Sequence, residues 1–141
     1  SVTQAFSQAP NPETMLDKKL APKMDDVNIT MPDDIKSCKV ELVKGSTAGG
    51  SGWVLRDAKG QTLRKFFDSN GDNKVDLWSY YKDGVEVYRE FDTKYKGSPD
   101  NFRWLNAGGM KWGVGAVDAS GKASISAWRM ISAEEGHPLL T

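Results

Sequence analysis

The sequence has one cysteine, one histidine and no excess of charge of either sign, with 19 basic and 19 acidic side chains in 141 residues. A single cysteine excludes an internal disulfide bond. Zero net charge argues against a nucleic acid or an anionic membrane as the partner, because both usually require a basic surplus or patch. No apolar run approaches the roughly 20 residues of a membrane span, so we expect no membrane insertion.

Patterns of catalytic residues are also scarce. His137 lies near the end of the chain, a poor position for a general base. Cys38 has no Cys-X-X-Cys partner and is expected to be a small buried residue rather than a nucleophile. Neither a Gly-X-Ser-X-Gly motif nor a phosphate-binding loop occurs, and glycine-rich residues 45–52 are interpreted as a flexible turn. We therefore expect a protein that is not an enzyme.

Aromatic residues are nearly absent from the first 30 positions, where only Phe6 occurs. The remaining aromatic residues all lie between positions 53 and 128, which locates the hydrophobic core there. The sequence thus predicts three parts: a weakly structured N-terminal arm with short helical turns, a folded domain and a C-terminal tail, at residues 1–37, 38–135 and 136–141.

Two helical turns are predicted inside the arm. Asn11 as the N-cap and Pro12 at the first position indicate a short helix that runs to Leu20. Asp33 and Asp34 lead a second turn. We expect the arm to dock weakly or to remain mobile.

From position 38 onward the pattern is that of β-strands joined by tight turns, for which Asp83-Gly84 is the clearest signal. The expected fold is an all-β antiparallel meander of hairpins. Its predicted strands cover residues 39–44, 53–56, 61–67, 74–81, 85–91, 101–105, 110–113 and 124–131.

Three loops led by aspartate suggest an internal repeat. The segment from Asp68 aligns without gaps with the segment from Asp118, and a related segment begins at Asp92 between them. An aromatic residue follows ten positions after each leading aspartate, which favours duplication over chance reuse of turn residues.

The first loop has the residue types of a calcium site. Oxygen ligands at positions 1, 3, 5 and 9, with a backbone carbonyl at position 7, can converge on one hard cation; they are Asp68, Asn70, Asp72, Asp76 and the carbonyl of Lys74. Asn73 stands at position 6, where a left-handed conformation is needed. The alternative is a turn in which the aspartates accept backbone hydrogen bonds.

We expect one calcium ion rather than three. Position 5 is lysine in the two later loops, at Lys96 and Lys122. A lysine cannot ligate calcium, but its charge can pair with the remaining carboxylates. The later loops are therefore expected to keep their shape without an ion.

Aromatic side chains offer a second functional interpretation. Trp78, Trp104 and Trp112 could line one sheet face and stack on sugars, or they could fill the core, which is the default because tryptophan carries a large apolar area. Alternation along the fourth strand places Trp78 and Tyr80 on one side and Ser79 on the other.

Five segments together resemble the secreted repeat proteins of planctomycete-type bacteria: GWVLRD (52–57), DSNGDNKVDLW (68–78), GVEVYR (84–89), RWLNAGGMKWG (103–113) and WRMISAEE (128–135). The first loop is also similar to the calcium loops of integrin-type propeller blades. The family resemblance implies an exported module without implying an activity. Lys94, Lys96, Lys122 and Ser126 depart from the acidic loops of that family.

The sequence therefore predicts a non-catalytic, calcium-stabilised β module that serves binding or assembly in an extracellular or periplasmic setting. Its expected partner is a protein or another component of the cell envelope, and a glycan is possible. The leading alternative is a carbohydrate- or cell-wall-binding domain that uses exposed aromatic rings.

Overall fold

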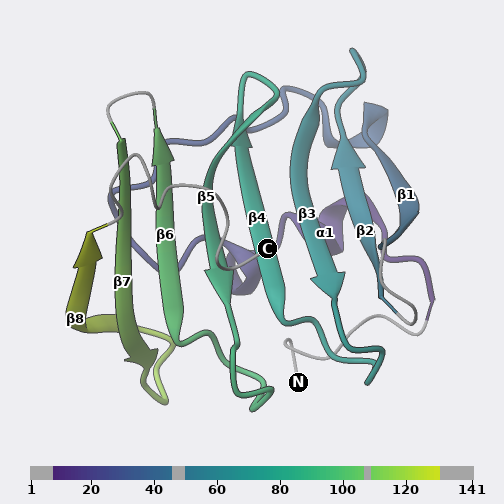
Figure 1. Cartoon of the computed structure of the whole chain (residues 1–141). Helices are drawn as coiled ribbons and strands as arrows, with labels where there is room; N and C mark the ends of the chain where they lie inside the picture. Colours follow the sequence, from purple (N-terminus) through teal and green to yellow (C-terminus); the bar gives the residue numbers. More distant parts are fainter. Residues whose placement is uncertain (1–7, 46–49, 107–108, 131–141) are drawn as a thin grey trace.

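The computed structural model describes residues 8–45, 50–106 and 109–130, and its strands form one eight-stranded antiparallel sheet in chain order (Figure 1). The strands are β1 (Lys39–Lys44), β2 (Ser51–Arg56), β3 (Thr62–Asp68), β4 (Leu77–Lys82), β5 (Val85–Phe91), β6 (Asn101–Asn106), β7 (Gly109–Val117) and β8 (Ala123–Met130). The expected all-β hairpin meander is confirmed.

Strand boundaries differ from expectation where loops or glycines intervene. β4 begins only at Leu77, because the residues up to Asp76 belong to the preceding loop. β7 runs on to Val117 through two glycines. A Cβ atom on Gly115 would lie 1.9 Å from the carbonyl oxygen of Ser124, so glycine here permits close approach of β8 rather than ending the strand.

The expected tight turn between β4 and β5 is confirmed. Asp83 and Gly84 both have positive φ angles, 51° and 80°. Two consecutive positive φ angles are the mark of a type I′ turn, whose twist matches that of the flanking strands.

The pairing register assigns side chains to the two faces of the sheet, because residues directly opposite each other on neighbouring strands point to the same face. One row on the face that contacts the N-terminal arm consists of Phe66, Trp78, Glu90 and Phe102. The next row, on the opposite face, consists of Lys65, Ser79, Arg89 and Arg103. We call the first the covered face and the second the open face.

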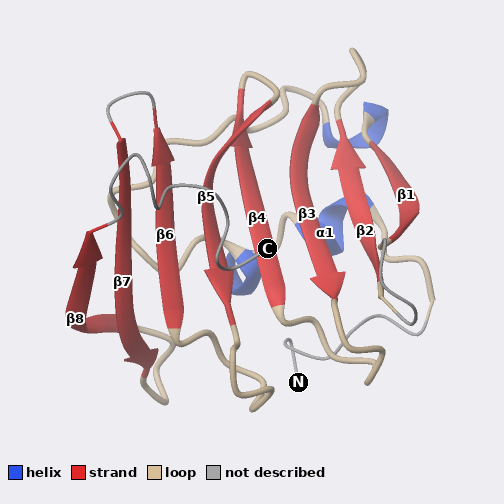
Figure 2. Cartoon of the chain, in the orientation of Figure 1, coloured by secondary structure: helices blue, strands red, loops and turns tan. Residues whose placement is uncertain are grey.

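Residues 8–37 of the arm cross the covered face, behind the strands in Figure 1. They form three short turns, α1 (Pro12–Met15), η1 (Lys18–Leu20) and η2 (Ile35–Ser37), and Figure 2 shows α1 behind the sheet. The single helix expected from Pro12 to Leu20 is interrupted. Asp17 accepts a hydrogen bond from the Lys19 N–H and so caps a new turn, which aspartate favours over a helix interior.

The packing of the arm corrects the expectation that it contributes little. Met15 is fully buried and Leu20 is 7% exposed, and both belong to the core. The Arg64 guanidinium donates to the carbonyl oxygens of Met15 and Leu20, at 3.1 and 3.2 Å, and the Tyr80 hydroxyl donates to the Leu20 carbonyl at 2.7 Å. The side chains of Met15 and Leu20 and two backbone carbonyls make this contact. The low aromatic content of the arm therefore gave no indication that the arm packs on the core.

A chain of aromatic contacts forms the core beneath the arm. Ring centroids are separated by 6.2 Å between Phe66 and Tyr80, 5.9 Å between Tyr80 and Tyr88, and 5.3 Å between Tyr88 and Trp104. Trp128 on β8 continues the chain, 5.6 Å from Trp104. None of the helices within the described residues is long and apolar enough to cross a membrane.

Candidate functional site

The loop between β3 and β4 has its carboxylates engaged by its own backbone. Asp68 accepts hydrogen bonds from three loop N–H groups, those of Gly71 (2.9 Å), Asp72 (3.3 Å) and Asn73 (2.9 Å). Two further hydrogen bonds are of this kind: the backbone N–H of Lys74 donates to the Asp72 carboxylate and that of Ser69 donates to the Asp76 carboxylate, both at 2.9 Å. Asn70 bonds to Asp72 through its carboxamide. These contacts are the ones expected for the alternative to a calcium site, a turn in which the aspartates accept backbone hydrogen bonds.

The conformation expected at position 6 is confirmed, since Asn73 has a φ angle of 65°. Burial raises the pKa of Asp76, partly offset by the hydrogen bond from Ser69. In the part of the chain that the structure describes, no three acidic, cysteine or histidine side chains are grouped to hold a metal ion. A carboxylate oxygen that accepts one hydrogen bond keeps a second acceptor position. Calcium binding by Asp68, Asn70, Asp72, Lys74 and Asp76 therefore stays a prediction.

The loop between β5 and β6 repeats the same hydrogen bonds without the acidic residue at position 5. Asp92 accepts from the backbone N–H groups of Lys96 (3.0 Å) and Gly97 (2.6 Å), and Asp100 accepts from that of Thr93 (3.1 Å). This loop therefore has the same hydrogen-bond pattern as the Asp68 loop. Lys96 contributes through its backbone N–H, and among the described residues its ammonium forms no ion pair, so the expected pairing of the lysine charge with the remaining carboxylates is not observed here. Retention of the loop shape without an ion stays a prediction.

The loop that starts at Asp118 is of a different type, so its sequence alignment with the Asp68 loop does not extend to the hydrogen bonds of the loop. Asp118 accepts from the N–H groups of Ser120 and Lys122, and the backbone of Asp118 bonds to Lys122 at 2.9 Å. The loop from Asp57 to Gln61 has the same pattern: the Asp57 carboxylate accepts from the N–H groups of Lys59 and Gln61, and the Asp57 N–H donates to the Gln61 carbonyl. Ser126 replaces the aspartate that closes the longer loop, and its hydroxyl donates to a carbonyl of β7 instead.

The three tryptophans predicted as possible sugar platforms are buried. Trp78, Trp104 and Trp112 are 4%, 8% and 4% exposed. The indole of Trp104 donates to Asp26 and that of Trp112 donates to Asn101. The default expectation of core packing is confirmed, and these rings do not form an exposed surface for stacking on a glycan.

Cys38 is buried, and its thiol lies 3.6 Å from the carbonyl oxygen of Asp34. Burial raises the pKa of the thiol, and nearby carboxylates such as Asp57 add to the shift. An activated nucleophile requires the opposite shift, so the environment favours the expected packing role. His137 and residues 131–141 lie outside the described residues.

The open face carries a groove with a volume of about 820 Å³, lined by residues of β1 to β5 and of the adjoining loops. Its apolar lining includes Val54, Leu77 and Phe91, and its cations include Lys65 and Arg89. This volume lies within the range of roughly 300–1,000 Å³ that small-molecule sites occupy. The groove is thus the described cavity best suited to hold a ligand.

Glycines shape one wall of the groove by making room for Phe67. A Cβ atom on Gly45 would lie 2.8 Å from the Phe67 ring, and one on Gly52 would lie 2.7 Å from it. The ring therefore lies against a strip of bare backbone. The glycine-rich segment was interpreted as a flexible turn, but the glycines on either side of the undescribed residues 46–49 have this packing role.

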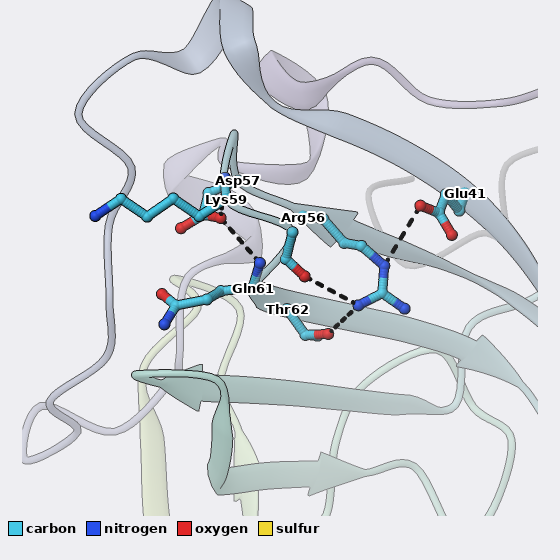
Figure 3. Close-up of polar contacts among 7 residues, drawn as sticks. Glu41, Arg56, Asp57, Lys59, Gln61 and Thr62 are labelled. Atoms are coloured by element: carbon cyan, nitrogen blue, oxygen red, sulfur yellow. Dashed lines mark hydrogen bonds and ion pairs between the residues drawn. The ribbon is translucent and has the colours of Figure 1, made fainter.

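Arg56, which lines the groove, is fixed by three neighbours (Figure 3). Its guanidinium contacts Glu41 at 3.4 Å, the Thr62 hydroxyl at 2.8 Å and the Gly60 carbonyl at 3.4 Å. The charge of Arg56 is balanced within the protein, and its side chain supports the β2–β3 hairpin.

Lys65 is different, because it forms no ion pair among the described residues. Its ammonium lies 5.4 Å from the centre of the Phe67 ring. Arg89 on the opposite side of β4 is bound by Glu86 through Nε and Nη2. A guanidinium has five N–H donors, so this pairing leaves further donors of Arg89 without Glu86 as a partner.

Ser79 lies between these two cations. The register places it directly opposite Lys65 on one side and Arg89 on the other. The residue is fully buried, and within the described residues its hydroxyl oxygen has no hydrogen-bond partner. An unsatisfied buried polar atom costs free energy and calls for an explanation.

Trp128 forms a second candidate surface at the edge of the sheet. Its ring is 52% exposed, and the Lys111 ammonium lies 5.0 Å from its centre and 4.4 Å from that of Trp104. Asp26 is 3.5 Å from the same ammonium. Gly113 gives the ring room, since a Cβ atom there would lie 3.2 Å from it.

Sequence reasoning missed both surfaces. Strand pairing brings Lys65, Ser79 and Arg89 together from three strands, and only the alternation of β4 hinted that Ser79 and Trp78 face opposite ways. Comparison of the chain with protein-family models, with curated proteins and with solved structures finds no match.

Proposed function

We propose that the protein is a non-catalytic binding module that takes a small ligand in the groove on its open face. The observation that carries the proposal is the asymmetry of the sheet: the arm packs on one face, whereas the other has a cavity of about 820 Å³ lined by apolar side chains together with charged ones, among them the carboxylates Asp76 and Asp92. Such a lining is typical of ligand sites, in which apolar contacts supply affinity and a few polar groups fix orientation.

An exported setting at the cell surface or in the periplasm is part of the same proposal. It is supported by the resemblance of residues 38–135 to secreted repeat proteins. Calcium in the Asp68–Asp76 loop is a separate proposal, supported by the spacing of the oxygen ligands and by the left-handed Asn73. The groove does not depend on it, because the loop is already closed by hydrogen bonds.

The test uses N-phenyl-1-naphthylamine, a neutral apolar dye whose fluorescence rises when it leaves water. We expect saturable binding with one dye per chain. Leu77 lines the groove, and Leu77→Lys places a charge there, so it should abolish the fluorescence increase.

Leu42→Lys is the matched control, because Leu42 is also a strand leucine but is 52% exposed and does not line the groove. It should leave dye binding unchanged. Absence of saturable binding in the wild type, or equal binding by both variants when both are folded by circular dichroism, would refute the proposal.

A second candidate function, glycan binding, is favoured by the exposed Trp128 rather than by the three buried tryptophans. An exposed ring flanked by fixed polar groups, here Lys111 and Asp26, offers a stacking surface together with hydrogen-bond partners for sugar hydroxyls. Affinity electrophoresis in gels that contain a neutral polysaccharide tests this function. Trp128→Ala should remove any retardation, and Val85→Ala, at another exposed site, should not.

A further inference from the structure

The proposed function leaves three features in and beside the groove unexplained: Lys65 and Arg89 line the groove, and the buried Ser79, which does not line it, lies between them in the strand register. Lys65 has no ion pair among the described residues, Arg89 retains donors beyond those that bind Glu86, and the Ser79 hydroxyl has no partner. All three lie in one row of the register on β3, β4 and β5. Side chains directly opposite each other on paired strands have Cβ atoms about 5 Å apart, so one small group can reach all three.

The chemistry of these groups selects an anion. An ammonium and a guanidinium only donate hydrogen bonds, and a serine hydroxyl can donate one as well. Tyr81 adds a fourth donor at the groove, because burial and the nearby Glu86 carboxylate raise the pKa of its phenol and keep it protonated at neutral pH. Several donors along one groove suit a group with two acceptor oxygens.

The surroundings of this point limit the anion to one with an apolar body. Phe67, Leu77 and Phe91 line the groove beside the cations, and the aromatic rings of Phe67 and Phe91 lie 5.4 and 5.7 Å from the charges of Lys65 and Arg89. A small hydrophilic ion would leave these surfaces without contact. A ligand with a hydrocarbon part and one anionic end satisfies both halves of the cavity.

We infer that the groove binds an amphipathic carboxylic acid, whose carboxylate lies over Ser79 between Lys65 and Arg89 and whose apolar part lies along Phe67, Leu77 and Phe91. This inference rests on the proposed function and specifies its ligand class. Lys65 supplies the unbalanced charge, and its flexible stem lets the ammonium move from above Phe67 to the ligand. The same movement uncovers the buried Ser79 hydroxyl, which then gains a hydrogen-bond partner from the ligand.

The experiment compares octanoate with 1-octanol as competitors for bound N-phenyl-1-naphthylamine. The two compounds share a chain length and differ in the carboxylate. We expect octanoate to displace the dye at a concentration at least about tenfold lower, because hydrogen bonds to a charged group are worth about 1.5–3 kcal/mol and 1.4 kcal/mol is a factor of ten. The preference should shrink as sodium chloride is added.

Two variants identify the groups responsible. Ser79→Ala and Lys65→Gln should each remove most of the preference for octanoate and leave displacement by octanol unchanged. Lys39→Gln is the control, since Lys39 is exposed on β1 and does not line the groove. Ser79→Ala should fold at least as stably as the wild type, because the deleted hydroxyl has no partner among the described residues.

The outcomes separate this inference from the proposed function. If the dye binds in the groove but octanol and octanoate compete equally, the binding module stands and the carboxylate site is overturned. Retention of the octanoate preference in Ser79→Ala and Lys65→Gln would also overturn the site. If the dye does not bind at all, the proposed function itself fails.

Discussion

The backbone N–H of Lys23 donates a 2.6 Å hydrogen bond to Oε2 of Glu90, and this bond joins the arm to the middle of the covered face. The same oxygen accepts a hydrogen bond from the Tyr88 hydroxyl at 2.7 Å. Glu90 is 1% exposed, and among the described residues it forms no ion pair. Burial raises its pKa to about 7, although the two hydrogen bonds oppose the shift.

We predict that the protein is more stable at pH 5 than at pH 8. Below the ordinary pKa of 4.5, Glu90 is protonated in both the folded and the unfolded states, so its full contribution to stability is present. As the pH rises toward 7, the unfolded chain releases this proton before the folded one does. Stability is then lost, by up to about 3 kcal/mol at 1.36 kcal/mol per pKa unit, and levels off above pH 7.

Urea unfolding at a series of pH values measures this effect. Glu90→Gln keeps an acceptor for the Lys23 N–H but cannot ionise, so it should flatten the pH dependence between 4.5 and 7. Glu13→Gln changes an exposed glutamate and should leave the pH dependence as in the wild type. An unchanged slope in Glu90→Gln would show that Glu90 does not cause it.

Met15 provides the second prediction, because its side chain is fully buried under the sheet while it lies in the arm. Met15→Ala should lower the free energy of unfolding by about 2–5 kcal/mol through lost contacts and a residual cavity. Met31→Ala should cost less than about 1 kcal/mol, since Met31 is 54% exposed. Equal small losses in chemical denaturation would restore the idea of a weakly docked arm.

Deletion of residues 1–30 extends this test. If the arm docked only weakly, as the sequence suggests, its deletion would change the melting temperature by only a few degrees. The contacts of Met15, Leu20 and Lys23 with the sheet predict instead that the truncated chain loses its cooperative unfolding transition. Calorimetry distinguishes the two outcomes.

The strands were predictable because each carries its signal locally. Val85 to Phe91 alternates between two turn signals, and its predicted boundaries coincide with β5. The packing of the arm was not predictable, because it depends on backbone carbonyls that accept hydrogen bonds from Arg64 and Tyr80, which lie far away in the sequence. Every residue has a backbone carbonyl group, so the amino-acid composition cannot indicate which carbonyls form such contacts.

The candidate sites show the same division. The Asp68 loop was found because its residues are contiguous in the sequence. Lys65, Ser79 and Arg89 come from three strands, and only the register unites them. Choosing Trp128 over Trp104 as the exposed ring required knowledge of which residues the arm covers, which alternation cannot supply.

The equivalence of the two long loops gives the third prediction. Asp68 and Asp92 each accept the backbone N–H groups at positions 5 and 6 of their loops, and both are buried. Asp68→Ala and Asp92→Ala should therefore each destabilise the protein by about 1–3 kcal/mol, the cost of leaving such donors without partners. Asp118→Ala should cost less, because Asp118 is exposed and water can replace its carboxylate. Similar losses at all three positions in thermal unfolding would contradict the distinction between the loop types.

The fourth prediction is that the Asp68–Asp76 loop binds one calcium ion. Asp72 is the decisive residue, because its exposed carboxylate accepts from Lys74 within the loop and can turn toward a cation without disturbing the core. Binding would also relieve the repulsion that Asp68 and Asp72 exert on the buried Asp76 carboxylate. Calcium at 100 times its dissociation constant should stabilise the fold by about 2.7 kcal/mol through mass action.

Titration calorimetry decides between the ion and the hydrogen-bonded turn. A stoichiometry near one in the wild type, lost in Asp72→Ala and kept in Asp92→Ala, supports the ion, because the second loop has Lys96 where the first has Asp72. Absence of binding heat, together with the same melting temperature in calcium and in chelator, rejects it. The hydrogen bonds to Asp68 would then account for the loop by themselves, as the equivalent bonds to Asp92 do in the loop that lacks the ligands.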